Sequence, residues 1–184
     1  MLLKPRLILV HGAGRDPWAP VIQRLAEPLD DALEIVTPDL RSTEDASQAA
    51  WMERLSDHIG HVKPNDILVG HSLGASQLLK WLAELQQPSP PKAFFALACP
   101  YWGAAEWEAD EYILSHDAAE ALTQIDLLSF WHGTADSVVP HEHLSYYQRK
   151  LLFAEFNSLT GIGHDFDDQS LKAIAHRLRQ VALS

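Results

Sequence analysis

The sequence predicts a three-layer α/β/α sandwich, in which a parallel sheet of about six strands lies between helices. Short runs rich in Val, Ile, Leu and Phe alternate along the chain with segments of helical periodicity, which is the pattern of a parallel sheet with crossover helices. The 184 residues are 47% hydrophobic, which is enough to bury a sizeable core. Because no linker, repeat or low-complexity tract divides residues 1–184, we expect a single domain.

The expected strands are apolar runs bounded by turn residues. They span residues 7–11, 34–38, 66–70, 93–99, 127–131 and 154–159. The run at 93–99 is almost wholly apolar, as expected of a strand that is covered on both faces. Polar and apolar residues alternate at 154–159, which favours an edge position for that strand.

Helices are expected where apolar residues recur at helical spacing. These segments are 18–29, 51–59, 75–85, 144–151 and 171–181. Pro17 and Pro20 open the first of them, and Ser42 and Thr43 are candidate caps of the second. Residues 101–126 mix aromatic with acidic side chains and lack a strand pattern. We therefore expect a short cap-like excursion there, over the carboxyl edge of the sheet.

Composition narrows the classes of partner and cofactor. A formal net charge of −11 argues against nucleic acid or an anionic membrane surface as a partner. The lone Cys99 rules out an internal disulfide, and no CxxC pair indicates a metal site. His141 and His143 are two apart at an expected helix start and would not share a face, so they do not indicate one either. The apolar run in residues 1–10 is too short for a signal peptide or membrane span, so a cytoplasmic location is expected.

The segment Gly70-His71-Ser72-Leu73-Gly74 fits the nucleophile-elbow pattern G-x-S-x-G. An apolar strand precedes it and an amphipathic helix follows, as the pattern requires. A serine on such a sharp turn needs small neighbours, which the two glycines supply, and its hydroxyl lies at the positive end of the next helix. Ser72 is therefore the candidate nucleophile. His71 is expected to pack or hydrogen-bond locally.

An acid and a base follow the serine in the chain. Asp136 lies in a Gly-containing turn after the strand that ends at Trp131, and His164 lies in a Gly-flanked loop after the last strand. A serine hydroxyl is a weak nucleophile until a base takes its proton, and a carboxylate can hold that base in the correct tautomer. We therefore predict His164 as the base and Asp136 as the acid that orients it.

Acyl transfer also needs backbone N–H groups that bind the developing oxyanion. One is expected from Leu73, the residue after the candidate nucleophile, and the other from Ala13 in the loop after the first strand. Glycines at positions 12 and 14 allow that loop to turn its N–H groups inward. The same loop lacks GKS and GxGxxG patterns, so it does not indicate a phosphate site.

These motifs together resemble the α/β-hydrolase superfamily, and within it the compact serine hydrolases related to retinoblastoma-binding protein 9 and the bacterial YdeN-type proteins. His-Gly at 11–12, GHSLG at 70–74, HGTAD at 132–136 and GIGH at 161–164 occur in the family's order, over almost the whole chain. The resemblance implies a minimal α/β-hydrolase fold with an all-parallel sheet of order 2-1-3-4-5-6. It also implies a triad of Ser72, His164 and Asp136, with Ala13 and Leu73 as oxyanion donors.

Specificity is expected to depend on aromatic side chains near the candidate site. Four lie in the excursion: Tyr101, Trp102, Trp107 and Tyr112. They either line an apolar acyl or alcohol pocket or close the core over a small sheet. Trp18 and Phe166, close in sequence to the two loops, are further candidates.

The expected function is that of a carboxylesterase-like serine hydrolase acting on a small or medium ester, without a metal or organic cofactor. An aminopeptidase or a thioesterase using the same triad is an alternative, because the fold hosts many chemistries. A binding protein that retains a hydrolase scaffold is another, although no member of the triad is missing from the sequence. A regulatory protein partner is left open.

Overall fold

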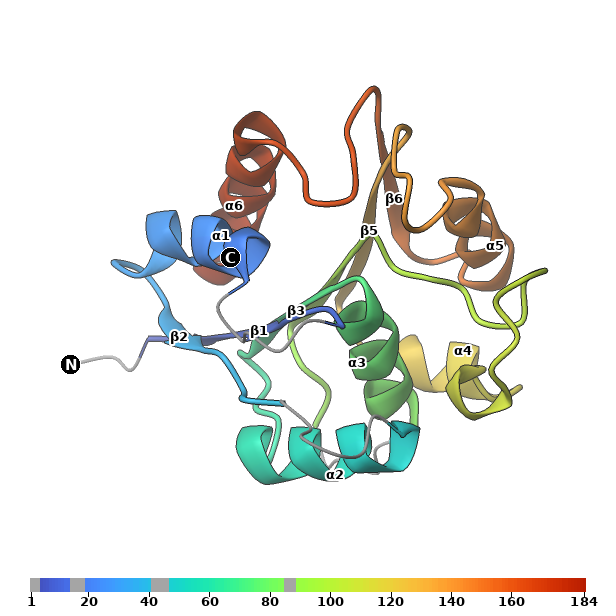
Figure 1. Cartoon of the computed structure of the whole chain (residues 1–184). Coiled ribbons are helices and arrows are strands. Elements are labelled where there is room, and N and C mark those ends of the chain that lie inside the picture. Colours follow the sequence, from blue (N-terminus) through green and yellow to red (C-terminus); the bar gives the residue numbers. More distant parts are fainter. Residues whose placement is uncertain (1–3, 14–18, 41–46, 85–88) are drawn as a thin grey trace.

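The computed structural model describes residues 4–13, 19–40, 47–84 and 89–184 (Figure 1). Within these ranges, six parallel strands form one sheet in the order β2-β1-β3-β4-β5-β6. The strands are β1 (Arg6–Val10), β2 (Glu34–Val36), β3 (Ile67–His71), β4 (Ala93–Leu97), β5 (Leu127–Gly133) and β6 (Glu155–Leu159). The predicted order and the parallel arrangement are confirmed. All carboxyl ends of the strands therefore meet at one edge of the sheet.

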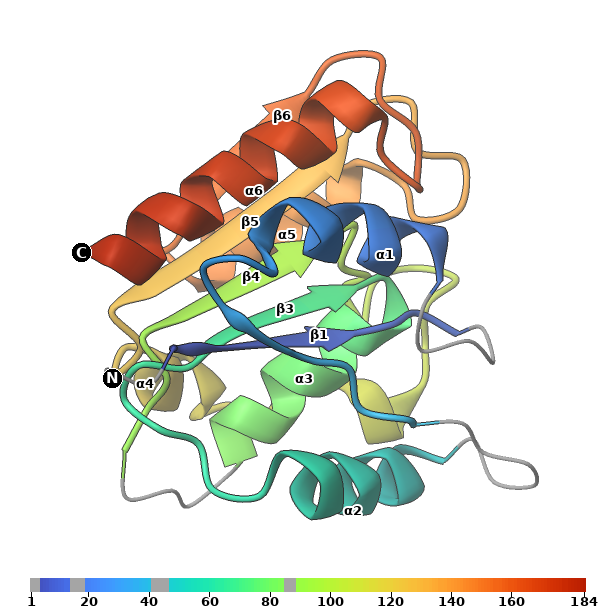
Figure 2. The same ribbon diagram turned by 90° about the vertical axis from the view of Figure 1, so that its left-hand side faces the viewer.

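Helices cover both faces of the sheet (Figures 1 and 2). One face carries α1 (Pro20–Ala26), the short η1 (Glu27–Leu29) and α6 (Asp168–Leu183). The other carries α2 (Gln48–Ile59), α3 (Leu73–Glu84), α4 (Ala118–Leu122) and α5 (Glu142–Lys150). The predicted three-layer sandwich is confirmed. Among the described helices, none combines the length and the apolar character needed to cross a bilayer.

Side chains of the central strands pack into two separate cores, because successive residues of a strand point to opposite faces of the sheet. In β1, Leu7 and Leu9 pack under α1 and α6, whereas Ile8 and Val10 pack under α2 and α3. All four are fully buried. Burial on both faces explains why β1 reads as a continuous apolar run rather than as an alternating one.

The start of α2 differs from the expectation. Its N-cap is Ser47, whose hydroxyl accepts a hydrogen bond from the Ala50 N–H at 3.3 Å. A serine at this position satisfies one of the N–H groups that the first helical turn leaves without a partner. The candidate caps Ser42 and Thr43 lie outside the described residues, as does Pro17, and α1 begins at Pro20.

Residues 101–126 contain the short η2 (Asp110–Tyr112) and α4, and no strand. The segment leaves the carboxyl end of β4 and runs alongside α3, where Lys80 donates to the Ile113 carbonyl at 2.8 Å. Ala118 and Leu122 of α4 join the core on the α3 side of the sheet. The excursion therefore flanks α3 before the chain enters β5.

Candidate active site

Ser72 occupies the turn between β3 and α3 in a left-handed backbone conformation, with φ of 54°. A non-glycine residue rarely adopts this conformation, which costs about 1–3 kcal/mol and persists only where the surroundings impose it. The Ser72 N–H donates to the Leu97 carbonyl of β4 at 2.8 Å, and the Ser72 carbonyl accepts from the Ala75 N–H at 2.9 Å. The turn is therefore fixed on both sides, and it is the sharp strand-to-helix turn that the motif predicts.

The two glycines of the motif allow the backbone segments to meet. A Cβ atom at Gly70 would lie 2.5 Å from Ala75 Cα, and one at Gly74 would lie 2.0 Å from the His11 carbonyl oxygen. Any larger residue would push α3 away from β3 or from the loop that follows β1. The sequence pattern G-x-S-x-G thus has a direct steric cause in this chain.

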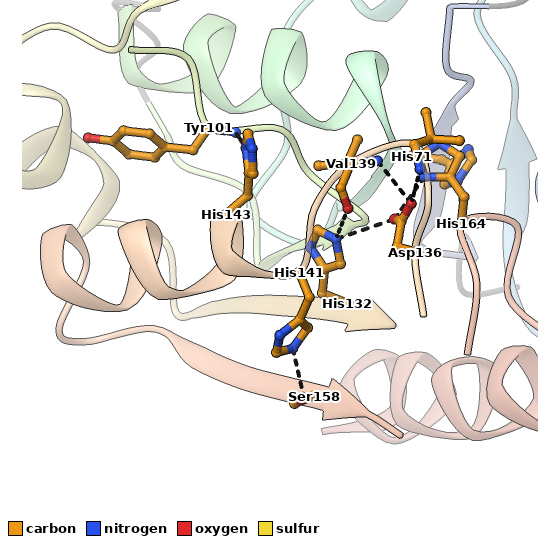
Figure 3. A network of polar contacts seen from close by, with 10 residues as sticks. His71, Tyr101, His132, Asp136, Val139, His141, His143, Ser158 and His164 are labelled. Atoms are coloured by element: carbon orange, nitrogen blue, oxygen red, sulfur yellow. Dashed lines mark hydrogen bonds and ion pairs between the residues drawn. The ribbon is translucent and has the colours of Figure 1, made fainter. Parts of the chain in front are cut away.

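Asp136 follows β5 and is held by contacts to both of its carboxylate oxygens (Figure 3). Its Oδ1 accepts from the N–H groups of Val138 and Val139, each at 2.9 Å. Its Oδ2 accepts from Nδ1 of His164 at 2.9 Å. Burial would raise the pKa of Asp136, but hydrogen bonds from His132, His164 and the two N–H groups outweigh it and hold that pKa well below its usual range. The carboxylate is therefore ionised at neutral pH.

His132 is a second histidine at the same carboxylate, and its role was not predicted from the sequence. Its Nε2 lies 2.9 Å from the Val139 carbonyl and 3.3 Å from Asp136 Oδ2. A carbonyl only accepts, so Nε2 carries the proton and points it at both oxygens. The side chain is 1% exposed at the end of β5. The available signal was a histidine at the end of an apolar strand, four residues before the acid.

The loop that carries His164 is bound to the loop that carries Asp136. The Thr134 and Ala135 N–H groups donate to the Leu159 and Ile162 carbonyls, both at 2.9 Å. A Cβ atom at Gly133 would lie 2.1 Å from the Ile162 carbonyl oxygen, so only glycine permits this approach. Contacts between the backbones thus hold His164 and Asp136 side by side.

His71 is buried, as packing requires, but its hydrogen bond is not the local one that was the alternative expectation. Its Nε2 donates to the His164 carbonyl at 3.0 Å, and the centroids of the two rings lie 4.9 Å apart (Figure 3). The turn at residues 70–74 and the loop that carries His164, here called the base loop, therefore meet through this side chain. Among the described residues, the hydroxyl of Ser72 forms no hydrogen bond to the His164 ring.

The loop after β1 passes directly against Ser72. A Cβ atom at Gly12 would lie 3.2 Å from Ser72 Cβ, and Ala13 is the next residue along the chain. His11 Nδ1 donates to the Gly12 carbonyl at 2.7 Å, which fixes the orientation of that peptide. Leu73 is the first residue of α3, where helix N–H groups have no partner within the helix. Ala13 therefore comes directly after Gly12, which approaches Ser72, and Leu73 comes directly after Ser72 itself.

The four aromatic side chains of the excursion are half-buried and contact one another or α5. The Trp102 ring lies 5.3 Å from Trp107 and 4.7 Å from Tyr112, and its Nε1 donates to Ser76 Oγ of α3 at 2.9 Å. Tyr101 stacks on Tyr146 of α5 at 5.3 Å. These contacts attach the aromatic cluster to Ser76 of α3 and to α5.

The two further aromatic candidates differ. Phe166 is buried beside the base loop, with its ring edge-on to His71 at 6.3 Å between centroids. Trp18 lies outside the described residues.

The model of the Alpha/beta hydrolase family matches residues 7–182. The chain belongs to this family. The match includes β1 from its second residue, the five other strands, and the segments that carry Ser72, Asp136 and His164. A search of curated proteins gives no significant match.

Solved structures similar to this hydrolase extend over nearly the whole chain. The ydeN gene product from B. subtilis is 16% identical and superposes with a TM-score of 0.84, over 98% of this chain and 100% of that one. Est1E from Butyrivibrio proteoclasticus is 15% identical, with a TM-score of 0.72 over 98% and 88% of the chains. Esterase PE8 is 22% identical, with a TM-score of 0.64 over 97% and 93%. At these identities the likeness establishes the fold, and it confirms the predicted resemblance to compact YdeN-type hydrolases.

The histidines at 141 and 143 have separate partners in the hydrolase. His143 Nδ1 accepts from the Tyr101 N–H at 2.8 Å, whereas His141 Nε2 lies 2.8 Å from Ser158 Oγ. They point in different directions from the start of α5 (Figure 3). Over the part of the chain that the structure describes, no group of three His, Cys, Asp or Glu residues is arranged to hold a metal ion.

Proposed function

We propose that this alpha/beta hydrolase is a serine hydrolase that cleaves a small or medium carboxylic ester through an acyl-enzyme. Ser72 is the nucleophile, His164 the base and Asp136 the acid. One observation carries the proposal: a serine in the left-handed conformation, φ 54°, lies at the same sheet edge as a histidine bonded to a buried carboxylate. The strain at Ser72 and the buried charge of Asp136 are both costly, and catalysis gives each a reason.

The tautomer of the His164 imidazole follows from its hydrogen bond to Asp136. Nδ1 of His164 is bonded to the Asp136 carboxylate, so Nδ1 carries a proton and Nε2 is the basic nitrogen. Nε2 takes the proton from the Ser72 hydroxyl as the serine oxygen attacks the ester carbonyl. The ionised Asp136 then stabilises the imidazolium that forms.

The N–H groups of Ala13 and Leu73 bind the oxyanion of the tetrahedral intermediate. Collapse of the intermediate breaks the bond to the alcohol, which leaves with the proton from His164 Nε2. Water then attacks the acyl group, with His164 as base again, and the second collapse returns the proton to Ser72 as the carboxylic acid departs. The protein supplies every group that this cycle uses.

Support for an ester as substrate comes from the names of two structural neighbours. Esterase PE8 is one, and Est1E has also been solved with ferulic acid bound. We propose that the half-buried rings of the excursion, Tyr101, Trp102, Trp107 and Tyr112, form apolar walls for the acyl or alcohol part. Thioesters and amides use the same cycle, so a substrate panel ranks the three bond types.

Intact-mass analysis after incubation with a fluorophosphonate probe tests the proposal. The comparison uses wild type, Ser72→Ala and a control, Ser145→Ala, which replaces a half-buried serine on α5. One adduct on wild type and on the control, and none on Ser72→Ala, is the expected result. Turnover of p-nitrophenyl acetate or butyrate should be lost in the same variant. A folded wild type without adduct would contradict the proposal and favour a binding protein on a hydrolase scaffold.

A further inference from the structure

His71 lies where three loops of the candidate site meet. It is the last residue of β3 and the immediate neighbour of Ser72. Its Nε2 donates to the His164 carbonyl at 3.0 Å, across 93 positions of sequence. Its Nδ1 would lie 3.6 Å from a Cβ atom at Gly12, so the loop after β1 passes beside the other edge of the ring. The His71 imidazole therefore adjoins Ser72, the base loop and the loop after β1, which contains Ala13.

The hydrogen bond from His71 controls the backbone of His164 rather than its reactive ring. The carbonyl that His71 binds belongs to the same residue whose Nδ1 binds Asp136. The ring contact at 4.9 Å adds a second constraint on the position of the His164 imidazole. His164 is thus held at its backbone from β3 and at Nδ1 from the loop after β5, which leaves Nε2 as the free end of the ring.

The protonation state of His71 suits this task. Because the side chain is only 5% exposed, burial lowers its pKa to about 4, so the ring is neutral in neutral solution. A neutral ring with its proton on Nε2 donates to the carbonyl without placing a positive charge beside His164. An imidazolium at His71 would oppose the charge that His164 acquires during the reaction.

We propose that His71 is a positioning residue that fixes the base loop to the nucleophile elbow and so directs His164 Nε2 toward Ser72. The inference rests on the proposed function and deepens it, since it assigns a task to a residue that the triad does not include. A side chain that only fills space at the end of β3 would need neither the donor nor its alignment with a single carbonyl.

Two substitutions separate the hydrogen bond from packing. His71→Leu keeps a side chain of similar bulk and removes the donor, whereas His71→Gln keeps an N–H donor near the position of Nε2. Leu55→Ala, in the core of α2, is the stability control because it creates a cavity away from the sheet edge. The probes are p-nitrophenyl butyrate, a fluorophosphonate and proton NMR of the low-field N–H of His164 that is bonded to Asp136.

We expect His71→Leu to lower kcat about 10- to 100-fold, with KM changed less than about twofold, because misplacement of a catalytic group by about 1 Å acts on the reaction step. The fluorophosphonate rate should fall by a similar factor, and the low-field proton signal should broaden or vanish. His71→Gln should recover most of both, and Leu55→Ala should retain them. A kcat for His71→Leu within about twofold of Leu55→Ala, with the signal intact, overturns the inference. An unlabelled wild type overturns the proposed function instead, and the NMR comparison still decides whether His71 positions His164.

Discussion

His132 directs its Nε2 proton to Asp136 Oδ2 at 3.3 Å, and this is the oxygen that also accepts from His164. The other carboxylate oxygen accepts from two backbone N–H groups. The carboxylate is therefore held against rotation on both sides, and its single contact with His164 is kept in a fixed direction. A carboxylate with fewer donors would be free to exchange its oxygens between partners.

Replacement of His132 by Phe should lower kcat about tenfold or more, because a hydrogen bond to a charged group is worth about 1.5–3 kcal/mol. The pKa of Asp136 should rise, since His132 is one of the donors that lower it. Ester turnover and the fluorophosphonate rate measure the first effect. His141→Gln is the control, because His141 is bonded to Ser158 rather than to Asp136. Equal turnover in both variants would show that His132 serves only to pack the end of β5.

The stability of the protein should fall as the pH is lowered from 6.5 toward 4. Burial lowers the pKa of His71 from 6.5 to about 4, and burial with the nearby His132 lowers that of His143 likewise. Between these values the unfolded chain binds protons that the folded chain does not, so unfolding becomes easier as protons are added. Since one pKa unit corresponds to about 1.4 kcal/mol, His71 alone contributes up to about 3 kcal/mol of this loss.

Urea unfolding at a series of pH values measures that dependence. In His71→Gln the slope between pH 6.5 and 4 should be shallower than in wild type, because one of the two histidines no longer titrates. A wild-type stability that is flat over this range would mean that neither buried histidine resists protonation.

Gly133→Ala should remove activity, because its Cβ would lie 2.1 Å from the Ile162 carbonyl oxygen and would force the acid and base loops apart. Gly163→Ala is a matched control in the adjacent loop, since its Cβ would lie no closer than 4.0 Å to its nearest neighbour, the Ala135 carbonyl oxygen. Ester turnover and the fluorophosphonate rate should fall at least tenfold in the first variant and stay near wild type in the second. Similar activity in both would show that the loops tolerate separation.

That Ser72, Asp136 and His164 lie at one edge of the sheet could be predicted from the sequence because each follows a strand. In a parallel sheet every strand ends at the same edge, so residues in such positions gather there whatever the loops between them. The order of the strands was accessible only through the resemblance to known hydrolases. Strand β1 illustrates the reason: its residues are apolar on both faces, so its pattern does not say which strands are its neighbours.

The tasks of His71 and His132 could not be predicted in the same way. A histidine beside a motif carries no signal of its hydrogen-bond partner, and the partner of His71 is 93 residues away on a loop. The position of that loop depends on the close approach of Gly133 to the Ile162 carbonyl, which is a property of the folded backbone. The cap of α2 was missed for a related reason. Several residues with hydroxyl groups precede the helix, and only the path of the chain selects Ser47.

Arg6 and Asp66 form an ion pair that ties the start of β1 to the start of β3, at the amino edge of the sheet. Arg6 Nε donates to Asp66 Oδ1 at 3.0 Å, its Nη2 binds Oδ2, and the Asp66 side chain is 2% exposed. The guanidinium also donates to the carbonyls of Ile59 and His61. The hydrogen bond that Arg6 donates to Asp66 raises the pKa of Arg6, so the guanidinium is charged at neutral pH.

Asp66→Leu should lower the free energy of unfolding by about 3–5 kcal/mol, because it leaves the guanidinium of Arg6 without its partner in a poorly solvated place. The double variant Arg6→Met with Asp66→Leu should lose much less than the sum of the single changes, since an apolar pair needs no compensation for lost hydration. Urea unfolding of the four proteins completes the cycle. Ester turnover per folded molecule should stay at the wild-type level in all four, because the pair lies at the edge of the sheet opposite to Ser72 and His164. A double variant as unstable as the sum would mean that the two charges act independently.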